Sequence, residues 1–299
     1  MNHEIAAHWY GDEFQLKNDC ELTNSSGLLR LLELATIQVD FAFPTPQILE
    51  SSFQLIYGIG ETTAVRLHDQ GYDTLNDLTF HPKWGKAACD IIRLIESRNV
   101  KRLAAYGASD LQLLSFYQPE EVQFVDIETT GLHSINPVFL VGILYCRQNQ
   151  WMIRQYLARD YSEEKALLWQ TAEHLKTARL ITSYNGKSFD LPYLKGRMRY
   201  HRISESETIT HIDLLRTTRR NYRKTLPNCR LLTIERYLFG SERSDDLPGS
   251  LVADHYHRYV ETGDEKLIRA ILKHNAEDLL SLAKLLGILV KNRKEGVPE

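Results

Sequence analysis

Cysteine is scarce in this chain of 299 residues, and the few cysteines are not grouped. The four of them are scattered, and none stands in the Cys-x-x-Cys spacing that is typical of zinc sites. Their arrangement gives no support to a disulfide framework either, which fits a reducing compartment. We therefore expect no cysteine-based metal site and no disulfide-stabilised fold.

Long apolar runs are absent as well. The amino-terminal stretch MNHEIAAHWYGDEF lacks the apolar core of a signal peptide, and no later stretch approaches the length of a membrane span. With 43% hydrophobic and 25% charged residues, the composition is that of an ordinary soluble globular protein. We expect a cytoplasmic protein without a membrane partner.

A strong excess of one charge is also missing, because the formal net charge is −3. This balance does not indicate nucleic-acid binding, but an acidic site and a local basic strip can occur on one protein. Between Leu214 and Arg230 there are six basic residues and no acidic one. Two interpretations stay open: the run is a solvated helix face, or it follows a phosphate backbone.

The length favours two domains. Residues 1–45 receive no function; within them GLLRLLELATI has helical periodicity, and the proline-interrupted FAFPTPQIL indicates a connector. The pattern of residues 46–110 predicts a small all-helical domain with short loops. The pattern of residues 120–292 predicts a second domain that mixes strands and helices.

In the helical domain, two apolar-periodic segments flank Gly58-Ile59-Gly60. The pattern resembles a helix-hairpin-helix element, in which glycines permit a tight turn and backbone N–H groups of the next helix face a phosphate. Gly58 and Gly60 are therefore candidate nucleic-acid contacts. A hairpin that only packs a small domain fits the same pattern.

In the second domain, three apolar runs, VQFVDIE, VFLVGILYC and WMIRQYLA, predict an antiparallel meander. An amphipathic helix in SEEKALLWQTAEHLKTA, a strand in ARLITSYN, a helix in LPYLKGRMRY, a strand in HIDLL and a long carboxy-terminal helix follow. This order predicts an α/β fold of the RNase H-like type, with a mixed five-strand sheet flanked by helices.

Two acids of this domain share one predicted strand. Asp126 and Glu128 are separated by one residue, so period-two alternation puts both carboxylates on one face. A buried strand rarely carries two such acids unless they are paired or bind a cation, because burying bare charge is costly. The alternative is a fraying strand end.

Two further acids lie elsewhere in the domain. Asp190 follows a turn-rich segment that leads from a strand into a helix, where an acid also serves as an N-cap. His274 and Asp278 are four residues apart on the long helix and share a face among apolar residues. Phosphodiester cleavage by two divalent cations needs hard oxygen ligands that a fold brings together. If the four acids converge, we expect an enzyme that cuts nucleic acid.

These segments resemble the DEDD exonuclease superfamily, and within it the YprB-like group of RNase H-like proteins, which commonly begin with a helix-hairpin-helix. The resemblance covers about residues 52–288 and rests on VDIETTGL, VFLVGILY, ITSYNGKSFDLPYL, HIDLLRTTRR, LPNCRLLTIERYLFG, DDLPGSLVADHYHRYVETGD and HNAEDLLSL, in that order. It implies four metal-site acids, namely Asp126, Glu128, Asp190 and Asp278. It also implies that His274 is the general base or orients the attacking water.

One spacing departs from this family. Its branches carry Tyr-x3-Asp or His-x4-Asp before the last acid, whereas this chain has His274 in a His-x3-Asp arrangement. An ordinary histidine pKa of about 6.5 suits proton transfer near neutral pH. The resemblance implies two Mg²⁺ or Mn²⁺ ions with Asp126 between them, since carboxylate ligands make zinc and copper poor candidates. His255 and His257 lack a third ligand at zinc spacing.

The predicted function is that of a metal-dependent 3′–5′ exonuclease that prefers DNA, in single-stranded form. Two alternatives stay open: an RNA exonuclease or structure-specific endonuclease that uses the same acids, and a nucleic-acid-binding module without catalysis. The residues predicted to position the strand in this domain are Asn185, Lys187, Arg216, Arg219 and Arg220.

Overall fold

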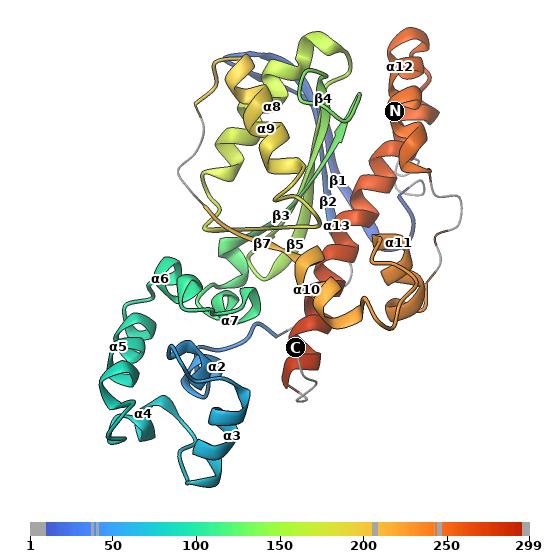
Figure 1. Cartoon of the computed structure of the whole chain (residues 1–299). Coiled ribbons are helices and arrows are strands. Elements are labelled where there is room, and N and C mark those ends of the chain that lie inside the picture. Colours follow the sequence, from blue (N-terminus) through green and yellow to red (C-terminus); the bar gives the residue numbers. More distant parts are fainter. Residues whose placement is uncertain are drawn as a thin grey trace. The chain divides into compact units, whose positions relative to one another are not determined.

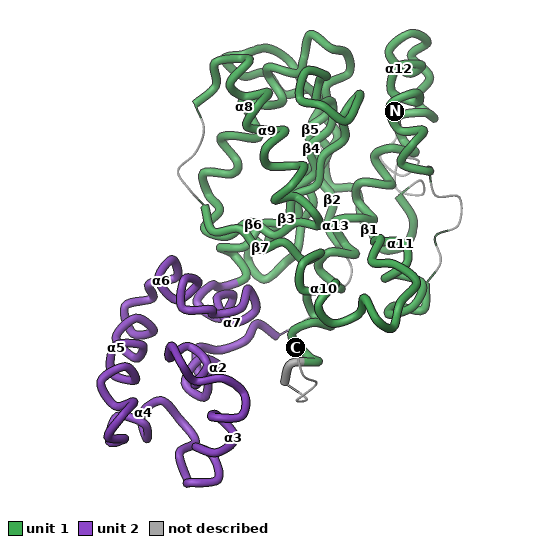
Figure 2. The backbone as a smooth tube through the Cα atoms, viewed as in Figure 1, with its two compact units in different colours: residues 1–41, 119–299 green, residues 42–118 purple. Residues whose placement is uncertain are grey.

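The chain forms two compact units (Figure 2). The structure is a computed structural model, and it describes residues 10–36, 39, 42–204, 209–241, 243 and 247–294. Unit 1 comprises residues 1–41 and 119–299, and unit 2 comprises residues 42–118. The amino-terminal segment that received no function thus contributes its described strands to unit 1.

One mixed sheet of seven strands organises unit 1, in the order β1-β2-β5-β4-β3-β6-β7. Neighbouring strands are antiparallel, except that β6 is parallel to both β3 and β7. The predicted α/β class with a mixed sheet is confirmed, although the sheet has seven strands where five were predicted. The strands are β1 Phe14–Asn24, β2 Gly27–Thr36, β3 Val122–Thr129, β4 Val138–Arg147, β5 Gln150–Leu157, β6 Leu180–Ser183 and β7 Thr210–Asp213.

Six α-helices belong to the described part of unit 1. They are α8 Glu164–Leu175, α9 Asp190–Tyr200, α10 Leu214–Tyr222, α11 Leu231–Ile234, α12 Val252–Thr262 and α13 Glu265–Lys294. Shorter turns are η3 Pro119–Glu121, η4 Tyr161–Glu163, the π-helical η5 Glu235–Phe239 and η6 Gly249–Leu251. Within the part of the chain that the structure describes, no helix is both long enough and apolar enough to cross a membrane.

Helices cover both faces of the sheet. Figure 1 shows α8 and α9 on one side of the central strands and α13 on the other, where it packs on β3, β4 and β5. Every residue of β4 except Arg147 is buried, as expected for a strand with helices on both faces. The core of unit 1 therefore consists of two apolar layers, one on each side of the sheet.

The helical prediction for GLLRLLELATI is wrong, because this segment forms strand β2. The backbone of β2 pairs with β5 on one side and with β1 on the other. Leucine-rich sequence favours a helix in isolation, but sheet pairing overrides that weak preference. The sequence signals for a hairpin were the alternating pattern of β1 and the glycine that ends the turn between Asn24 and Gly27.

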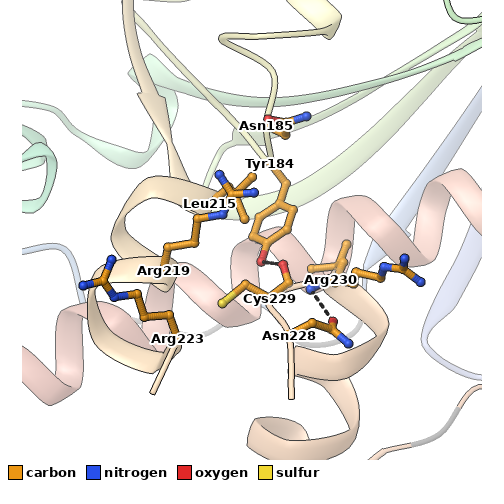
Figure 3. Close-up of a pocket in the computed structure, with 9 residues that line it drawn as sticks. Tyr184, Asn185, Leu215, Arg219, Arg223, Asn228, Cys229 and Arg230 are labelled. Carbon is orange, nitrogen blue, oxygen red and sulfur yellow. Dashed lines mark hydrogen bonds between the residues drawn. The ribbon is translucent and has the colours of Figure 1, made fainter. Parts of the chain in front are cut away.

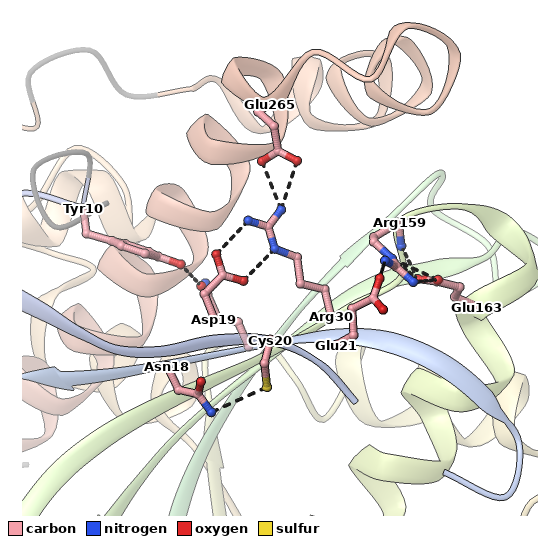
Figure 4. Close-up of polar contacts among 10 residues, drawn as sticks. Tyr10, Asn18, Asp19, Cys20, Glu21, Arg30, Arg159, Glu163 and Glu265 are labelled. Atoms are coloured by element: carbon pink, nitrogen blue, oxygen red, sulfur yellow. Dashed lines mark hydrogen bonds and ion pairs between the residues drawn. The ribbon is translucent and has the colours of Figure 1, made fainter. Parts of the chain in front are cut away.

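Ion pairs tie the β1–β2 hairpin to the rest of unit 1 (Figure 4). Arg30 on β2 pairs with Asp19 on β1 at 2.8 Å and with Glu265, at the start of α13, at 3.0 Å. Arg159, which follows β5, pairs with Glu21 on β1. The hairpin therefore extends the sheet at its β5 edge and also contacts helix α13.

Unit 2 is all-helical in its described residues. Its elements are α2 Gln47–Glu50, η2 Phe53–Leu55, α3 Glu61–Asp69, α4 Leu75–Leu78, α5 Gly85–Glu96, α6 Val100–Ala105 and α7 Asp110–Leu114. Gly58 has a positive φ of 89°, and Gly60 is the N-cap of α3 in an extended conformation. The segment before the glycines is the short 3₁₀ turn η2 rather than a full helix.

Candidate active site

Strand β3 carries Asp126 and Glu128 on one face of the sheet. Asp126 lies opposite Gly142 of β4, and Gly142 lies opposite Gln155 of β5, so the three positions form a row across the strands. The register between β3 and β4 is regular up to Glu128 and shifts directly after it. Both acids therefore stand near the end of β3, on the face that α13 covers.

Asp190 is buried at the start of α9. The backbone N–H groups of Asp190 itself and of Ile127, which lies between the two acids of β3, donate hydrogen bonds to its carboxylate. Gly186 allows the preceding turn to approach closely, because a Cβ there would stand 2.2 Å from Ser183 Oγ and 3.1 Å from Asp190 Oδ2. The turn thus holds Asp190 against β3.

Helix α13 brings His274 and Asp278 to the same region. His274 Nε2 lies 3.8 Å from Asp278 Oδ2. Arg243 donates a hydrogen bond of 2.5 Å to Asp278 Oδ1, and its Nε donates one of 2.8 Å to buried Glu235. Arg243 is therefore a counter-charge in direct contact with one of the predicted metal-site acids.

The four acids act on one another electrostatically, and we refer to Asp126, Glu128, Asp190 and Asp278 as the acid cluster. Burial raises the pKa of Asp126 well above its ordinary value, and the charges of the other three acids raise it further. Burial also raises the pKa of Glu128 to about 8, while nearby His274 opposes the rise. The pKa of Asp190 is raised by burial to about 7. The structure thus brings together all five residues predicted to be catalytic.

A row of buried side chains holds Asp126 in place. Asn275 Nδ2 donates a hydrogen bond of 2.8 Å to Asp126 Oδ2. Gln155 Nε2 donates to Asn275 Oδ1 at 2.9 Å and to the carbonyl oxygen of Leu272 at 2.7 Å. The Tyr10 hydroxyl donates to Gln155 Oε1 at 2.5 Å. We refer to Tyr10, Gln155 and Asn275, all fully buried, as the amide relay.

Along the amide relay, each hydrogen bond is donated in the direction of Asp126. Burial raises the pKa of the Tyr10 hydroxyl, which therefore keeps its proton and remains a donor. Because the oxygen of each amide accepts from the preceding donor, the NH₂ group of Asn275 must face Asp126. Gly142 makes room for this contact, since a Cβ there would stand 2.1 Å from Asn275 Oδ1. The fold therefore fixes both the position and the orientation of one carboxylate.

The chemistry of the acid cluster suits a hard divalent cation. Carboxylate oxygens are the ligands that Mg²⁺ and Mn²⁺ prefer, and buried like charges require a compensating positive charge. Among the described residues, no three His, Cys, Asp or Glu side chains stand close enough together to hold a metal ion as placed. The acid cluster therefore fits a divalent cation by the type of its donor atoms and by its charge. His257 lies outside the cluster, on α12, with its Nδ1 2.6 Å from the Tyr161 hydroxyl.

The residues predicted to position the strand fall into three groups. Asn185 and Arg219 line one cavity of about 670 Å³ (Figure 3). Arg216 and Arg220 are exposed on α10 outside that lining, and Lys187 is exposed in the turn before Asp190. Gly58 and Gly60 belong to unit 2. We call the cavity the arginine pocket; it is lined by Tyr184, Asn185, Leu215, Arg219, Arg223, Asn228, Cys229, Arg230 and Leu231.

Asp213 connects this pocket with the turn that carries Asp190. Its Oδ1 accepts hydrogen bonds from the backbone N–H groups of Asn185 at 2.8 Å and Leu215 at 3.1 Å. Its Oδ2 accepts one from the backbone N–H of Lys187 at 3.1 Å. This buried acid therefore caps α10 and fixes the turn, which explains an acid at the end of β7 without a catalytic role.

Several residues of the site were not identified from sequence. Asn275 is a buried polar residue next to His274 on an apolar helix, and Gly142 interrupts an apolar strand; both were usable signals. Gln155, the partner of Asn275, can be identified only when the register of three strands is known. Arg243 stands in a stretch without helical or strand periodicity, and no sequence signal pointed to it.

Comparison with known proteins identifies the family. A family model described as the RNase_H superfamily matches residues 123–290, which is more than half of the chain. The chain therefore belongs to the RNase_H superfamily, and the predicted RNase H-like fold is confirmed.

Two curated relatives each match 56% of the chain. YprB of Bacillus subtilis (strain 168) is 31% identical over 173 residues, which cover 56% of this chain and 42% of YprB. The protein MJ0365 of Methanocaldococcus jannaschii is 30% identical over 175 residues, which cover 56% of this chain and 93% of that protein. The predicted resemblance to the YprB-like group is confirmed. The chain spans less than half the length of YprB.

Among solved structures, the chain is similar to the family B DNA polymerase from the hyperthermophilic archaeon Pyrobaculum calidifontis. The two align with a TM-score of 0.45 and 17% sequence identity. The alignment covers 59% of this chain and 25% of the polymerase chain.

Proposed function

We propose that this chain is a metal-dependent 3′–5′ exonuclease that prefers single-stranded DNA, of the DEDD type. One observation carries the proposal. Four carboxylates from β3, α9 and α13, far apart in sequence, lie close enough to act on one another's ionisation, within a domain of the RNase_H superfamily. Such a concentration of buried negative charge is unfavourable on its own and suits cations.

The acid cluster would hold two Mg²⁺ or Mn²⁺ ions, which supply Lewis acidity and lower the pKa of a bound water molecule. The chain's own residues have separate tasks. Asn275 fixes the orientation of Asp126. His274, beside Glu128 and Asp278, accepts a proton from the attacking water at its ring nitrogen. Arg243 holds Asp278 and offsets part of the negative charge of the cluster.

The hairpin of unit 2 suits a phosphate backbone. Gly60, the N-cap of α3, forms no side-chain capping hydrogen bond, so no capping side chain takes up the backbone N–H groups of the first turn. Tyr57, just before the glycines, is 94% exposed and offers an aromatic face at the same turn. We assign to this unit the role of holding nucleic acid.

An assay with end-labelled DNA and RNA oligonucleotides, in Mg²⁺, Mn²⁺ or chelator, tests the proposal. With a metal ion, 5′-labelled single-stranded DNA should give a ladder of products shortened stepwise from the 3′ end, and chelator should abolish it. Faster release from RNA would reassign the substrate, and internal cuts would reassign the enzyme as an endonuclease. No cleavage of any substrate would favour a binding module without catalysis.

A further inference from the structure

The arginine pocket is a positively charged cavity without a counter-charge of its own (Figure 3). Arg219 lies on α10, Arg223 at its carboxy-terminal end and Arg230 at the start of α11. Among the described residues that line the cavity, none is acidic, and none of the three arginines forms an ion pair with another described side chain. Three arginines without an acid among the lining residues make the cavity positively charged, which suits an anionic ligand.

A second cavity, of about 450 Å³, adjoins the arginine pocket. It shares Asn228 and Arg230 with the arginine pocket, and Arg236, Arg243 and the Arg243 partner Glu235 also line it. Arg243 in turn donates its hydrogen bond to Asp278 of the acid cluster. Arginines therefore line both cavities, and one of them, Arg243, contacts a carboxylate of the acid cluster.

The walls of the arginine pocket combine charged and apolar groups. Leu215 and Leu231 contribute apolar surface beside the guanidinium groups. The ring of Tyr184 is fixed there by the hydrogen bond from its hydroxyl to the carbonyl oxygen of Cys229, at 2.6 Å. A polymer with alternating phosphates and less polar sugars and bases matches such walls better than a lone anion does.

We propose that the arginine pocket binds the phosphodiester backbone of the strand whose end lies at the acid cluster, at nucleotides that are not being cut. Arg219, Arg223 and Arg230 bind the phosphates, and Tyr184 with the two leucines packs against sugar or base. The identity of the ligand as substrate rests on the proposed function. The contact itself is a binding contact, and it is measured without cleavage.

A cysteine in the pocket reports on occupancy. Cys229 lines the pocket, and Cys20 on β1 is a matched control, because both are free thiols of intermediate exposure. The full chain is treated with iodoacetamide in chelator, with and without single-stranded DNA at about ten times its Kd, and alkylation is followed by peptide mass spectrometry. We expect alkylation of Cys229 to slow by about tenfold and that of Cys20 to stay unchanged.

Three results would overturn the proposal. The first is equal alkylation of Cys229 with and without bound strand. The second is equal slowing at Cys20. The third is protection of Cys229 by inorganic phosphate as strong as that by the strand at the same phosphate concentration, because this would make the pocket a simple anion site.

Substitutions give an independent test. Strand affinity is measured by fluorescence anisotropy in chelator for Arg219→Gln with Arg230→Gln, and for Arg258→Gln, an exposed arginine on α12, as a control. At about 0.1 M salt each lost phosphate contact should weaken binding about fivefold and make the log–log salt slope shallower by about 0.7. The control should match the parent chain. Unchanged affinity and slope in the double variant would contradict the proposal.

The two proposals can fail separately. A chain that cuts nothing but shows protection of Cys229 by the strand would contradict the nuclease and keep the pocket. A chain that cuts DNA with Mn²⁺ while Cys229 stays unprotected would keep the nuclease and overturn the pocket.

Discussion

The acid cluster and the arginine pocket differ in how their charged side chains are held. In the cluster, Asn275 holds Asp126 and Arg243 holds Asp278, and burial raises the pKa of Glu128 to about 8. In the pocket, the arginines are exposed, and none of them is paired with an acid among the described residues. This difference indicates that groups proposed to hold ions are fixed by the scaffold, whereas groups proposed to take up the strand are left accessible.

The contrast has a measurable consequence. A substitution in the acid cluster or the amide relay alters groups that are buried and bonded to each other, so it should change the rate of cleavage, the stability of the fold or both. A substitution in the arginine pocket alters exposed groups, so it should change strand affinity and leave stability unchanged.

The largest effect is expected for Asp126→Asn. The rate of Mn²⁺-dependent nucleotide release should fall by about three orders of magnitude or more, because charge stabilisation by a bound ion is worth several kcal/mol. The melting temperature in chelator should not fall, because burial and the neighbouring acids already favour the neutral form of Asp126 and the amide oxygen still accepts from Asn275. Single-turnover kinetics and thermal melting check the two parts. Loss of activity that merely follows a collapse in melting temperature would contradict a role in metal binding.

A smaller effect is expected in the amide relay. Asn275→Leu leaves Asp126 and Gln155 without a buried partner, so the free energy of unfolding should fall by about 1–3 kcal/mol. The rate should fall by about tenfold to a hundredfold, because the carboxylate loses its fixed orientation. Tyr10→Phe, at the far end of the relay, should cost about 1 kcal/mol of stability and change the rate far less. Equal rates for Asn275→Leu and the parent chain would mean that the relay serves stability alone.

A substitution in the arginine pocket should change KM and leave kcat and stability unchanged. Arg219→Gln should raise KM for single-stranded DNA by about fivefold at about 0.1 M salt and leave kcat and the melting temperature unchanged. The measurement is steady-state kinetics at several salt concentrations, with Arg258→Gln alongside. A fall in kcat at constant KM would place Arg219 in the catalytic step and break the contrast between the two regions.

The smallest effect is expected in the hairpin of unit 2. Gly60 has an ordinary φ of −92° and open space around it, so Gly60→Ala should fold normally and weaken DNA binding by less than about tenfold. Gly58 has a φ of 89°, and an added Cβ would stand 3.3 Å from the Trp84 ring, so Gly58→Ala should lose about 1 kcal/mol of stability. Binding titrations and thermal melts of the two variants separate these effects. Unchanged DNA affinity for Gly60→Ala would argue that the hairpin serves another purpose.

Local patterns were sufficient to predict most of the catalytic domain. The three strands of the meander have apolar runs of ordinary strand length, and the spacing of Asp126 and Glu128 needs only period two to put them on one face. The β1–β2 hairpin was missed because its leucines repeat as they do in a helix, and only pairing with β5 decides the matter.

The rest of the site depends on contacts that no local pattern contains. Asn275 meets Asp126 only because Gly142 and Gln155 lie in register beside it on neighbouring strands. The basic run after Asp213 was recognised as a run, but the fold decides that Arg219 lines a pocket and Arg216 does not.

Calorimetric titration of Mn²⁺ into the metal-free chain measures whether the acid cluster is a metal site. We expect the parent chain to bind two ions and Asp126→Asn to lose the binding of both or to bind at least about tenfold more weakly. Arg258→Gln should bind as the parent chain does. Absence of Mn²⁺ binding by the parent chain, or equal binding by Asp126→Asn, would contradict the assignment of the acid cluster as a metal site.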